Sequence, residues 1–359
     1  MNRPLLLVTN QVPPDRVGAL RALNDREGLE VAIYDGRLHH ATGGVDDPGV
    51  PFRRISQHEA FSLAASGTYR AVIATSAGRI ALPAAYLGAR RAGVPFVYWT
   101  GIWHQVATPA HLVAAPLVRW IESHADAVVA YGPHVADYVK SHGARNVHVA
   151  PQAVDVAFWG EPVDGAPARE RLGSPEFLLV FAGRDRPGKG LATALEAWRL
   201  AGVDGVFALA GVDSEETRVA GKPDEDRGAP RIEALGMLAP GELRELFAAA
   251  DALVIPSEAT AAFREPWGLV ANEAMLQGTP VIATDAVGAA AGGLVRDGQT
   301  GVVVRAGDAG ALASGISRLA ASPELRGRLA QRGRTEALAY DFEAWTEAFS
   351  RALEPAGTS

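Results

Sequence analysis

Short apolar runs separated by helical patterns fill the first part of the chain. The runs lie at 4–9, 29–34, 70–74, 95–99, 126–130 and 146–150. Each has the length of a buried strand, and a helix is expected at about 15–26 between the first two. Strands that alternate with helices predict a parallel, doubly wound sheet. Such sheets bind ligands beyond the carboxyl ends of their strands, which here points to the loops 10–16, 75–78, 100–105 and 131–134.

A second alternation of the same kind follows a loosely patterned stretch. Its expected strands lie at 177–181, 205–210, 231–235, 252–255, 280–284 and 301–304, and its later helices at about 308–321, 323–338 and 342–354. Proline and glycine are frequent over 151–176, which is typical of a linker. We therefore expect an α/β protein with two Rossmann-like domains, the first over 1–155 and the second over 156–339.

Composition excludes several other classes of protein. A chain of 359 residues, 48% hydrophobic and 21% charged, is typical of a globular protein with two cores. Its net charge of −7 argues against broad nucleic-acid binding. The absence of cysteine excludes disulfides and thiol catalysis. No apolar run has the length of a signal peptide or a membrane span, so a cytoplasmic location is expected.

The stretch from Glu265 to Gly278 carries the clearest candidate chemistry. Pro266 suits the first turn of a helix that would end at Gly278. The N–H groups of Gly268 and Leu269 would then point out of the helix start, where the helix dipole favours an anion. Glu265 would lie on the loop side and Glu273 about two turns inward. Two carboxylates that bracket a phosphate-sized site suit the hydroxyl groups on either side of a diphosphate.

A second candidate site follows the first strand of the second domain. Residues 183–190 read GRDRPGKG, which departs from the P-loop pattern only at its last position. Gly190 stands where a P-loop has serine or threonine, and it has no hydroxyl to bind magnesium. We expect Arg184 and Lys189 to converge as cations on a diphosphate instead. No Gly-x-Gly-x-x-Gly follows the first strand of the chain, which argues against a dinucleotide oxidoreductase.

These motifs together resemble those of a known enzyme family. EPWGLVANEAM, with two glutamates separated by seven residues, resembles the signature of retaining family-four glycosyltransferases of GT-B architecture. The 183–190 loop is similar to the family's donor pyrophosphate motif, and 151–155 to its interdomain turn. The resemblance implies two Rossmann-like domains facing across a cleft, with a last helix (about 340–359) that packs back onto the first. That first domain would take the acceptor and the second the donor.

The resemblance also implies an activity. The chain would be a hexosyltransferase-like enzyme that moves a sugar, with retention, from a UDP-, GDP- or similar nucleoside-diphosphate sugar to a hydroxyl acceptor. It would need neither metal nor cofactor. The residues implied in catalysis are Glu265, Arg184, Lys189 and His104, and those implied in donor binding are Glu273, Gly268, Leu269, Gly183, Gly236 and Met237.

The first domain is less informative. The family places a histidine after the fifth strand of its fold. Simple alignment puts Gly101 at that position, in the loop after the run at 95–99, and His104 lies three residues later. His104 therefore stands as a catalytic candidate beside a structural or acceptor-side role. His134 is a weaker candidate, for which helix capping is the simpler interpretation. In the second domain no carboxylate occurs between Asp285 and Asp297, where relatives often have one, which puts any donor contact of that residue in doubt.

Several alternatives stay open at this point. One is a non-catalytic nucleotide-sugar-binding subunit, and another is a GT-B epimerase or phosphorylase. The simplest alternative for EPWGLVANEAM is an ordinary amphipathic helix with two surface glutamates. The acceptor could be a glycan, a lipid-linked molecule or a small molecule. Leu112, Leu117 and Trp120, with Arg119 nearby, would either make a peripheral membrane contact or pack against the protein.

Overall fold

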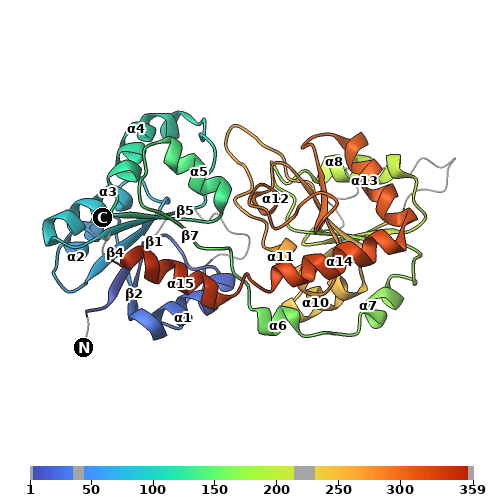
Figure 1. Ribbon diagram of the computed structural model, residues 1–359, viewed down its shortest axis with the longest axis horizontal. Coiled ribbons are helices and arrows are strands. Elements are labelled where there is room, and N and C mark those ends of the chain that lie inside the picture. Colours follow the sequence, from blue (N-terminus) through green and yellow to red (C-terminus); the bar gives the residue numbers. More distant parts are fainter. Residues whose placement is uncertain (1–2, 35–43, 214–230, 355–359) are drawn as a thin grey trace. The chain divides into compact units, whose positions relative to one another are not determined.

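The computed structural model describes residues 3–34, 44–213 and 231–354. The chain divides into two compact units (Figure 1). Unit 1 comprises Met1–Asp155 together with Asp341–Ser359, and unit 2 comprises Val156–Tyr340. Each unit has its own parallel sheet with helices on both faces. The predicted α/β fold with two Rossmann-like domains is therefore confirmed.

The sheet of unit 1 has the strand order β3-β2-β1-β4-β5-β6-β7. Its strands are β1 (Leu5–Thr9), β2 (Leu29–Tyr34), β3 (Phe52–Ile55), β4 (Ala71–Thr75), β5 (Phe96–Thr100), β6 (Ala127–Ala130) and β7 (Val147–Val149). The helices are η1 (Pro14–Arg16), α1 (Val17–Glu27), α2 (Glu59–Ala64), α3 (Ala81–Ala92), α4 (Pro109–His124), α5 (Pro133–Ser141) and α15 (Phe342–Leu353). All strand pairs described in this sheet are parallel.

Alternate residues of β1 enter the two cores of unit 1. Leu5 and Leu7 join the core beneath α1 and α15, whereas Leu6 and Val8 join the core beneath α2, α3 and α4. The alternation follows from the pleat of a strand, which sends successive side chains to opposite faces. A strand buried on both faces therefore needs a continuous apolar run, as LLLVT provides.

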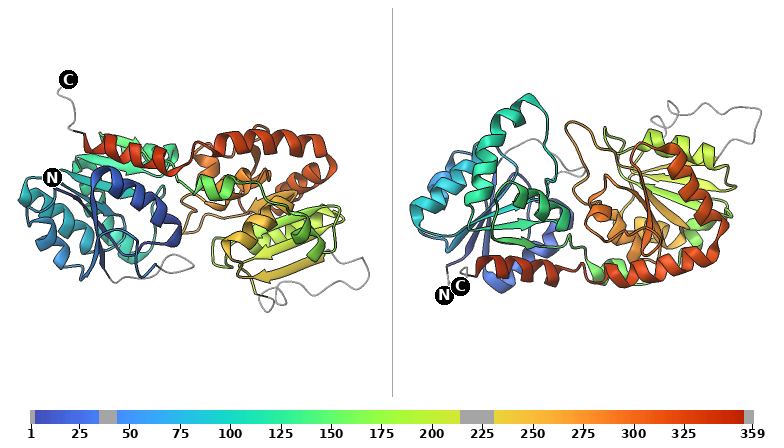
Figure 2. Two further views of the ribbon diagram at one scale, coloured as in Figure 1. Left: turned by 90° about the horizontal axis from the view of Figure 1, so that it is seen from below. Right: turned by 45° about the horizontal axis from the view of Figure 1, so that its top comes forward.

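Helix α15 completes the first of these cores. The rings of Trp345 and Phe349 pack against Trp99 of β5, with centroids 5.6 and 5.4 Å away. Asp341 caps the helix by accepting a hydrogen bond of 2.7 Å from the backbone N–H of Ala344. Figure 2 shows α15, in red, alongside the blue N-terminal part of the chain, and α1 and α15 are in contact. The last helix is thus an integral part of unit 1.

Unit 2 has the strand order β10-β9-β8-β11-β12-β13, also parallel. Its strands are β8 (Leu178–Ala182), β9 (Val206–Ala210), β10 (Arg231–Gly236), β11 (Ala252–Ile255), β12 (Val281–Thr284) and β13 (Gly301–Val304). Its helices are α6 (Val156–Gly160), α7 (Ala166–Arg171), α8 (Leu191–Ala201), α10 (Pro240–Ala249), α11 (Val270–Leu276), α12 (Gly288–Ala291), α13 (Ala309–Ala321) and α14 (Pro323–Ala337).

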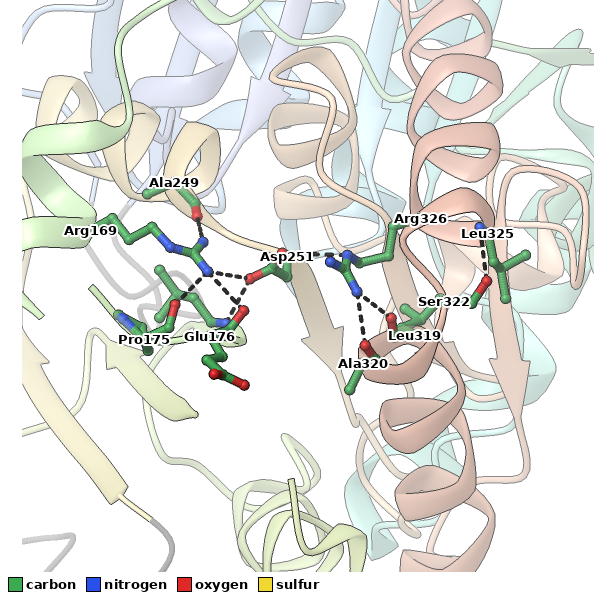
Figure 3. Close-up of polar contacts among 11 residues, drawn as sticks. Arg169, Pro175, Glu176, Ala249, Asp251, Leu319, Ala320, Ser322, Leu325 and Arg326 are labelled. Atoms are coloured by element: carbon green, nitrogen blue, oxygen red, sulfur yellow. Dashed lines mark hydrogen bonds and ion pairs between the residues drawn. The ribbon is translucent and has the colours of Figure 1, made fainter. Parts of the chain in front are cut away.

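The amino-terminal edge of this sheet is held by an ion-pair network (Figure 3). The carboxylate of Asp251 lies 2.9 Å from Arg169 of α7 and 3.3 Å from Arg326 of α14. It also accepts a hydrogen bond of 2.8 Å from the N–H of Leu178, at the start of β8. One carboxylate thus ties two helices to the beginning of two central strands, and the opposite edge carries the candidate chemistry.

Candidate functional site

The candidate site lies where the strand order of unit 2 reverses direction. From β8 the chain adds β9 and β10 on one side, then returns to add β11, β12 and β13 on the other. The connections that follow β8 and β11 therefore continue toward opposite sides of the sheet. The carboxyl edge between these two strands is where open α/β sheets bind ligands. Lys189 belongs to the first loop and Glu265 to the segment after β11.

An ion pair joins these two loops. The ammonium of Lys189 donates a hydrogen bond to Oε2 of Glu265. The hydroxyl of Ser257 donates a second one, of 3.1 Å, to the same oxygen. Glu265 is only 7% exposed, so its charge requires such partners. The hydroxyl of Thr284 in turn donates to the carbonyl of Ser257 at 2.5 Å, which fixes the segment that carries the serine.

Contacts with the segment after β11 hold the loop that carries Lys189. The N–H of Glu258 donates to the carbonyl of Gly188 at 2.8 Å, and the Glu258 carboxylate accepts a bond of 2.5 Å from the hydroxyl of Thr193. The ammonium of Lys189 also lies 5.6 Å from the centre of the Phe263 ring, within cation–π range. Lys189 therefore has a defined position rather than that of an exposed lysine on a free loop.

Gly190 lets this loop approach the next strand. It has φ of +70°, and a Cβ at this position would lie 1.9 Å from the carbonyl oxygen of Pro256. Any other residue would push the loop away from β11. The glycine that disqualifies the P-loop thus brings the loops after β8 and β11 together.

The helix predicted from Pro266 begins later than expected. Helix α11 starts at Val270, and Gly268 has φ of +91°, which is not helical. Glu265 forms a β-bridge with Val287 instead, and the carbonyls of Glu265 and Trp267 accept backbone bonds of 3.1 and 2.8 Å from the first residues of α12. The prediction that Pro266 occupies the first turn is therefore wrong.

This correction changes the anion site as well. Leu269 is the residue before α11, and Glu273 lies in the first turn rather than two turns inward. The helix has only seven residues, so its dipole is weak and the cations must supply most of the positive potential. Within the described part of the chain, the N–H groups of Gly268 and Leu269 have no backbone acceptor.

The remaining predicted donor residues line the same edge of the sheet. Gly183 and Arg184 follow β8 directly, and Gly236 and Met237 lie at the end of β10. Gly183 donates a backbone bond of 2.9 Å to Ala210 of β9, and Gly211 donates one of 2.6 Å to Gly236. The ends of β8, β9 and β10 therefore form one continuous rim, in which Arg184 is half-buried and the side chain of Met237 is exposed.

The histidines of unit 1 occupy a different edge. His104 is half-buried in the loop between β5 and α4, and His134 is the second residue of α5. The residue before α5 is Gly132, and no side chain caps this helix, so helix capping by His134 is wrong. The His134 ring instead packs edge-on against Trp103, with centroids 4.8 Å apart.

Sequence reasoning missed three contributors to the site in unit 2, which are Ser257, Phe263 and Thr284. Ser257 is the second residue after β11, and this position beyond the carboxyl end of a central strand could have marked it. Arg264 is a further cation beside Glu265, and it donates a bond of 3.4 Å to the carbonyl of Asp285. Burial lowers the pKa of Arg264, and Asp285 opposes part of that shift, but an arginine so placed stays protonated at neutral pH.

The described residues contain no group of three or more histidine, aspartate or glutamate side chains placed to hold a metal ion. Nor does any helix among them have the length and apolar character needed to cross a membrane.

Comparison with known proteins decides the family. A model described as glycosyl transferases group 1 matches residues 166–336, which is nearly all of unit 2. The chain is 32% identical over 293 residues to D-inositol 3-phosphate glycosyltransferase of Actinosynnema mirum, an alignment that covers 73% of this chain and 67% of that protein. The chain belongs to the group 1 glycosyl transferases.

Further relatives agree with this assignment. A lipopolysaccharide core biosynthesis glycosyltransferase, LpsE of Rhizobium meliloti, is 32% identical over 234 residues, or 64% of each chain. The chain thus matches about two thirds of the length of these two curated glycosyltransferases. The crystal structure of Anabaena HepE in complex with UDP has a TM-score of 0.77, with 21% identity, and covers 98% of this chain and 99% of that one. The fold of this glycosyltransferase is therefore GT-B.

Proposed function

We propose that this glycosyltransferase moves a hexosyl group from a nucleoside-diphosphate sugar to a hydroxyl acceptor, with retention at the anomeric carbon. The observation that carries the proposal is the meeting of Lys189 and Glu265 at the reversal point of the unit 2 sheet. A cation and a carboxylate at one place suit a donor that has a diphosphate beside a sugar with several hydroxyl groups. The structural relative HepE is described as a complex with UDP, which supports a donor of this class.

Different residues of unit 2 would bind different parts of the donor. Arg184 and Lys189, with the N–H groups of Gly268 and Leu269, would stabilise the negative charge that develops on the leaving diphosphate. Glu265 would accept hydrogen bonds from the hydroxyl groups of the donor sugar, and Glu273 from the ribose. Gly236 and Met237 would border the base, and Gly183 would belong to the loop that holds the pyrophosphate. The side chains of Arg184 and Lys189 would supply the positive charge that a divalent metal would otherwise bring, so we propose that transfer is metal-independent.

The proposed reaction is balanced without a cofactor. The bond between the anomeric carbon and the phosphate oxygen breaks, and the acceptor oxygen forms its bond on the same face. The acceptor proton passes to the departing diphosphate, which acts as the base. We assign the acceptor to unit 1, where His104 follows β5, and the hydroxyl can belong to a glycan, a lipid-linked molecule or a small molecule.

The test is ligand-dependent stability followed by product analysis. A nucleoside diphosphate at about 100 times its Kd should add about 2.7 kcal/mol to the free energy of unfolding, which a thermal-shift panel of UDP, GDP and their sugars would detect. Transfer or slow donor hydrolysis by the stabilising sugar, in EDTA and with an unchanged anomeric configuration by NMR, is the expected result. Stabilisation by none of these nucleotides would overturn the proposal.

A further inference from the structure

Helix α4 carries apolar side chains on both of its faces. Its inner face packs against the core beneath it through Val118 and Ile121. On its outer face, Val113 is 83% exposed, Leu117 47% and Trp120 46%. The spacings of four and three residues place these side chains on a single stripe of the helix. A surface helix of a globular protein normally presents charged and polar residues there, so this stripe needs another explanation.

The apolar surface continues onto the neighbouring helix α3. Trp120 packs edge-on against Tyr86 of α3 with centroids 5.3 Å apart, and Arg90 of α3 donates a bond of 2.5 Å to the carbonyl of His124. The two helices therefore lie side by side on one face of the unit 1 sheet (Figure 1). Leu87 of α3 is also exposed. We call these exposed residues the α3–α4 patch, which consists of Leu87, Leu112, Val113, Leu117 and Trp120.

The exposed formal charges on helices α3 and α4 themselves are all positive. Exposed arginines lie just before α3, at its end and on α4, and they are Arg79, Arg90, Arg91 and Arg119. The only carboxylate within α3 or α4 is Glu122, which is buried and contacts His142 at 2.9 Å. The nearest acid after α4, Asp126, is paired with Arg90 at 3.1 Å. A basic, apolar surface on a chain with a net charge of −7 is thus a local feature.

We infer that the α3–α4 patch docks this protein on an anionic lipid bilayer. Leucine, valine and tryptophan side chains would enter the boundary between head groups and acyl chains, and the arginines would lie at the level of the lipid phosphates. A second copy of the chain fits less well, because a symmetric contact through this surface would place arginines against arginines. This inference is independent of the donor site, since it uses residues of unit 1 alone.

Vesicle sedimentation of the intact protein tests the inference. We expect binding to vesicles of phosphatidylcholine with phosphatidylglycerol, weak binding to phosphatidylcholine alone, and a loss of binding as salt screens the charges. Val113→Glu with Leu117→Glu should lower the partition coefficient by about tenfold or more. Arg79→Glu with Arg91→Glu should abolish the preference for the anionic lipid. Leu200→Glu, at a 60% exposed leucine of α8, is the matched control and should bind like the unaltered protein.

Two results would overturn the inference. One is vesicle binding by the Val113→Glu, Leu117→Glu variant that equals the binding of the unaltered chain, including the case in which neither binds. Unchanged thermal melting of the variant shows that it is folded. The other is a dimer by light scattering that the same variant converts to a monomer, which would assign the patch to a second copy.

Discussion

Lys189 and Glu265 are in contact although 76 positions separate them in the sequence. Neither residue is exposed enough for the pair to be a trivial surface contact, since their side chains are 31% and 10% exposed. The pair sets the charge of the candidate site before any ligand arrives. A bound diphosphate would therefore compete with Glu265 for the same ammonium, and the two functions of Lys189 can be measured separately.

Replacing Lys189 by Ala should affect both functions. Nucleoside-diphosphate affinity should fall about 10- to 100-fold, since a charge-assisted contact contributes about 1.5–3 kcal/mol. The ligand-free protein should also lose stability, because the buried Glu265 carboxylate loses its cation. Calorimetry and denaturant unfolding measure the two effects.

A double-mutant cycle with Glu265→Gln isolates the pair, and we expect a coupling of about 1–3 kcal/mol in the ligand-free protein. Arg186→Ala is the control, because Arg186 is an exposed cation of the same loop. If diphosphate affinity is the same in the Lys189→Ala variant and in the unaltered protein, the pyrophosphate assignment is mistaken.

The two glutamates should differ in what they stabilise. Glu265→Gln should lower the single-turnover rate constant by about 100-fold or more while nucleotide affinity changes little, because its hydrogen bonds strengthen in the transition state. Glu273→Gln should instead weaken nucleotide binding by about tenfold, since the ribose loses a charged acceptor. Affinity and single-turnover rate for each variant decide the matter. Equal effects of both substitutions on both quantities would contradict the division between sugar and ribose.

Ser257 should act as a positioning residue for Glu265. In Ser257→Ala the carboxylate loses the hydrogen bond that the Ser257 hydroxyl donates, and we expect the transfer rate constant to fall about tenfold with nucleotide affinity preserved. Thr335→Ala is the matched control, because its hydroxyl bonds only a carbonyl of its own helix. A fall in nucleotide affinity equal to the fall in rate would show that Ser257 supports the fold of the loop and not the carboxylate.

The opposite edge of the same sheet should govern stability alone. Asp251→Asn removes the charge that holds Arg169 and Arg326, and should lower the free energy of unfolding by about 2–4 kcal/mol. Glu245→Gln, which breaks an exposed pair with Arg171, should change it by about 0.5 kcal/mol or less. Saturating nucleotide should bind both variants equally under native conditions. Similar stability of the two variants would show that the Asp251 network is not structural.

The sequence predicted most strands well because their apolar runs are continuous and buried on both faces. Strand β3 was not predicted, since FRRI is exposed at the edge of its sheet and carries no apolar pattern. The helix after Glu265 was predicted to begin too early, because proline is compatible both with the first turn of a helix and with an extended segment. The bridge from Glu265 to Val287, which no local pattern reveals, decides between the two.

The candidate site was predicted in its members but not in its contacts. Lys189 and Glu265 were each assigned to a donor from their motifs, yet their mutual contact depends on the order of strands β8 and β11. Ser257 and Thr284 act through a chain of hydrogen bonds that runs from the end of β12 to the segment after β11, where Glu265 lies. Such a chain has no local signature, and only the position of Ser257 beyond the end of a strand could have pointed to one of the two hydroxyls.

Helix α15 has a consequence for how the protein is made. Unit 2 is one continuous segment, Val156–Tyr340, whereas unit 1 requires residues from Asp341 onward. Because a chain emerges from the ribosome amino end first, Trp345 and Phe349 become available only after all of unit 2 has been synthesised. The core of unit 1 can therefore be completed only after the last helix has been synthesised, and until then Trp345 and Phe349 do not cover Trp99. Unit 2 can therefore reach its final structure before unit 1, in the reverse of the order of synthesis.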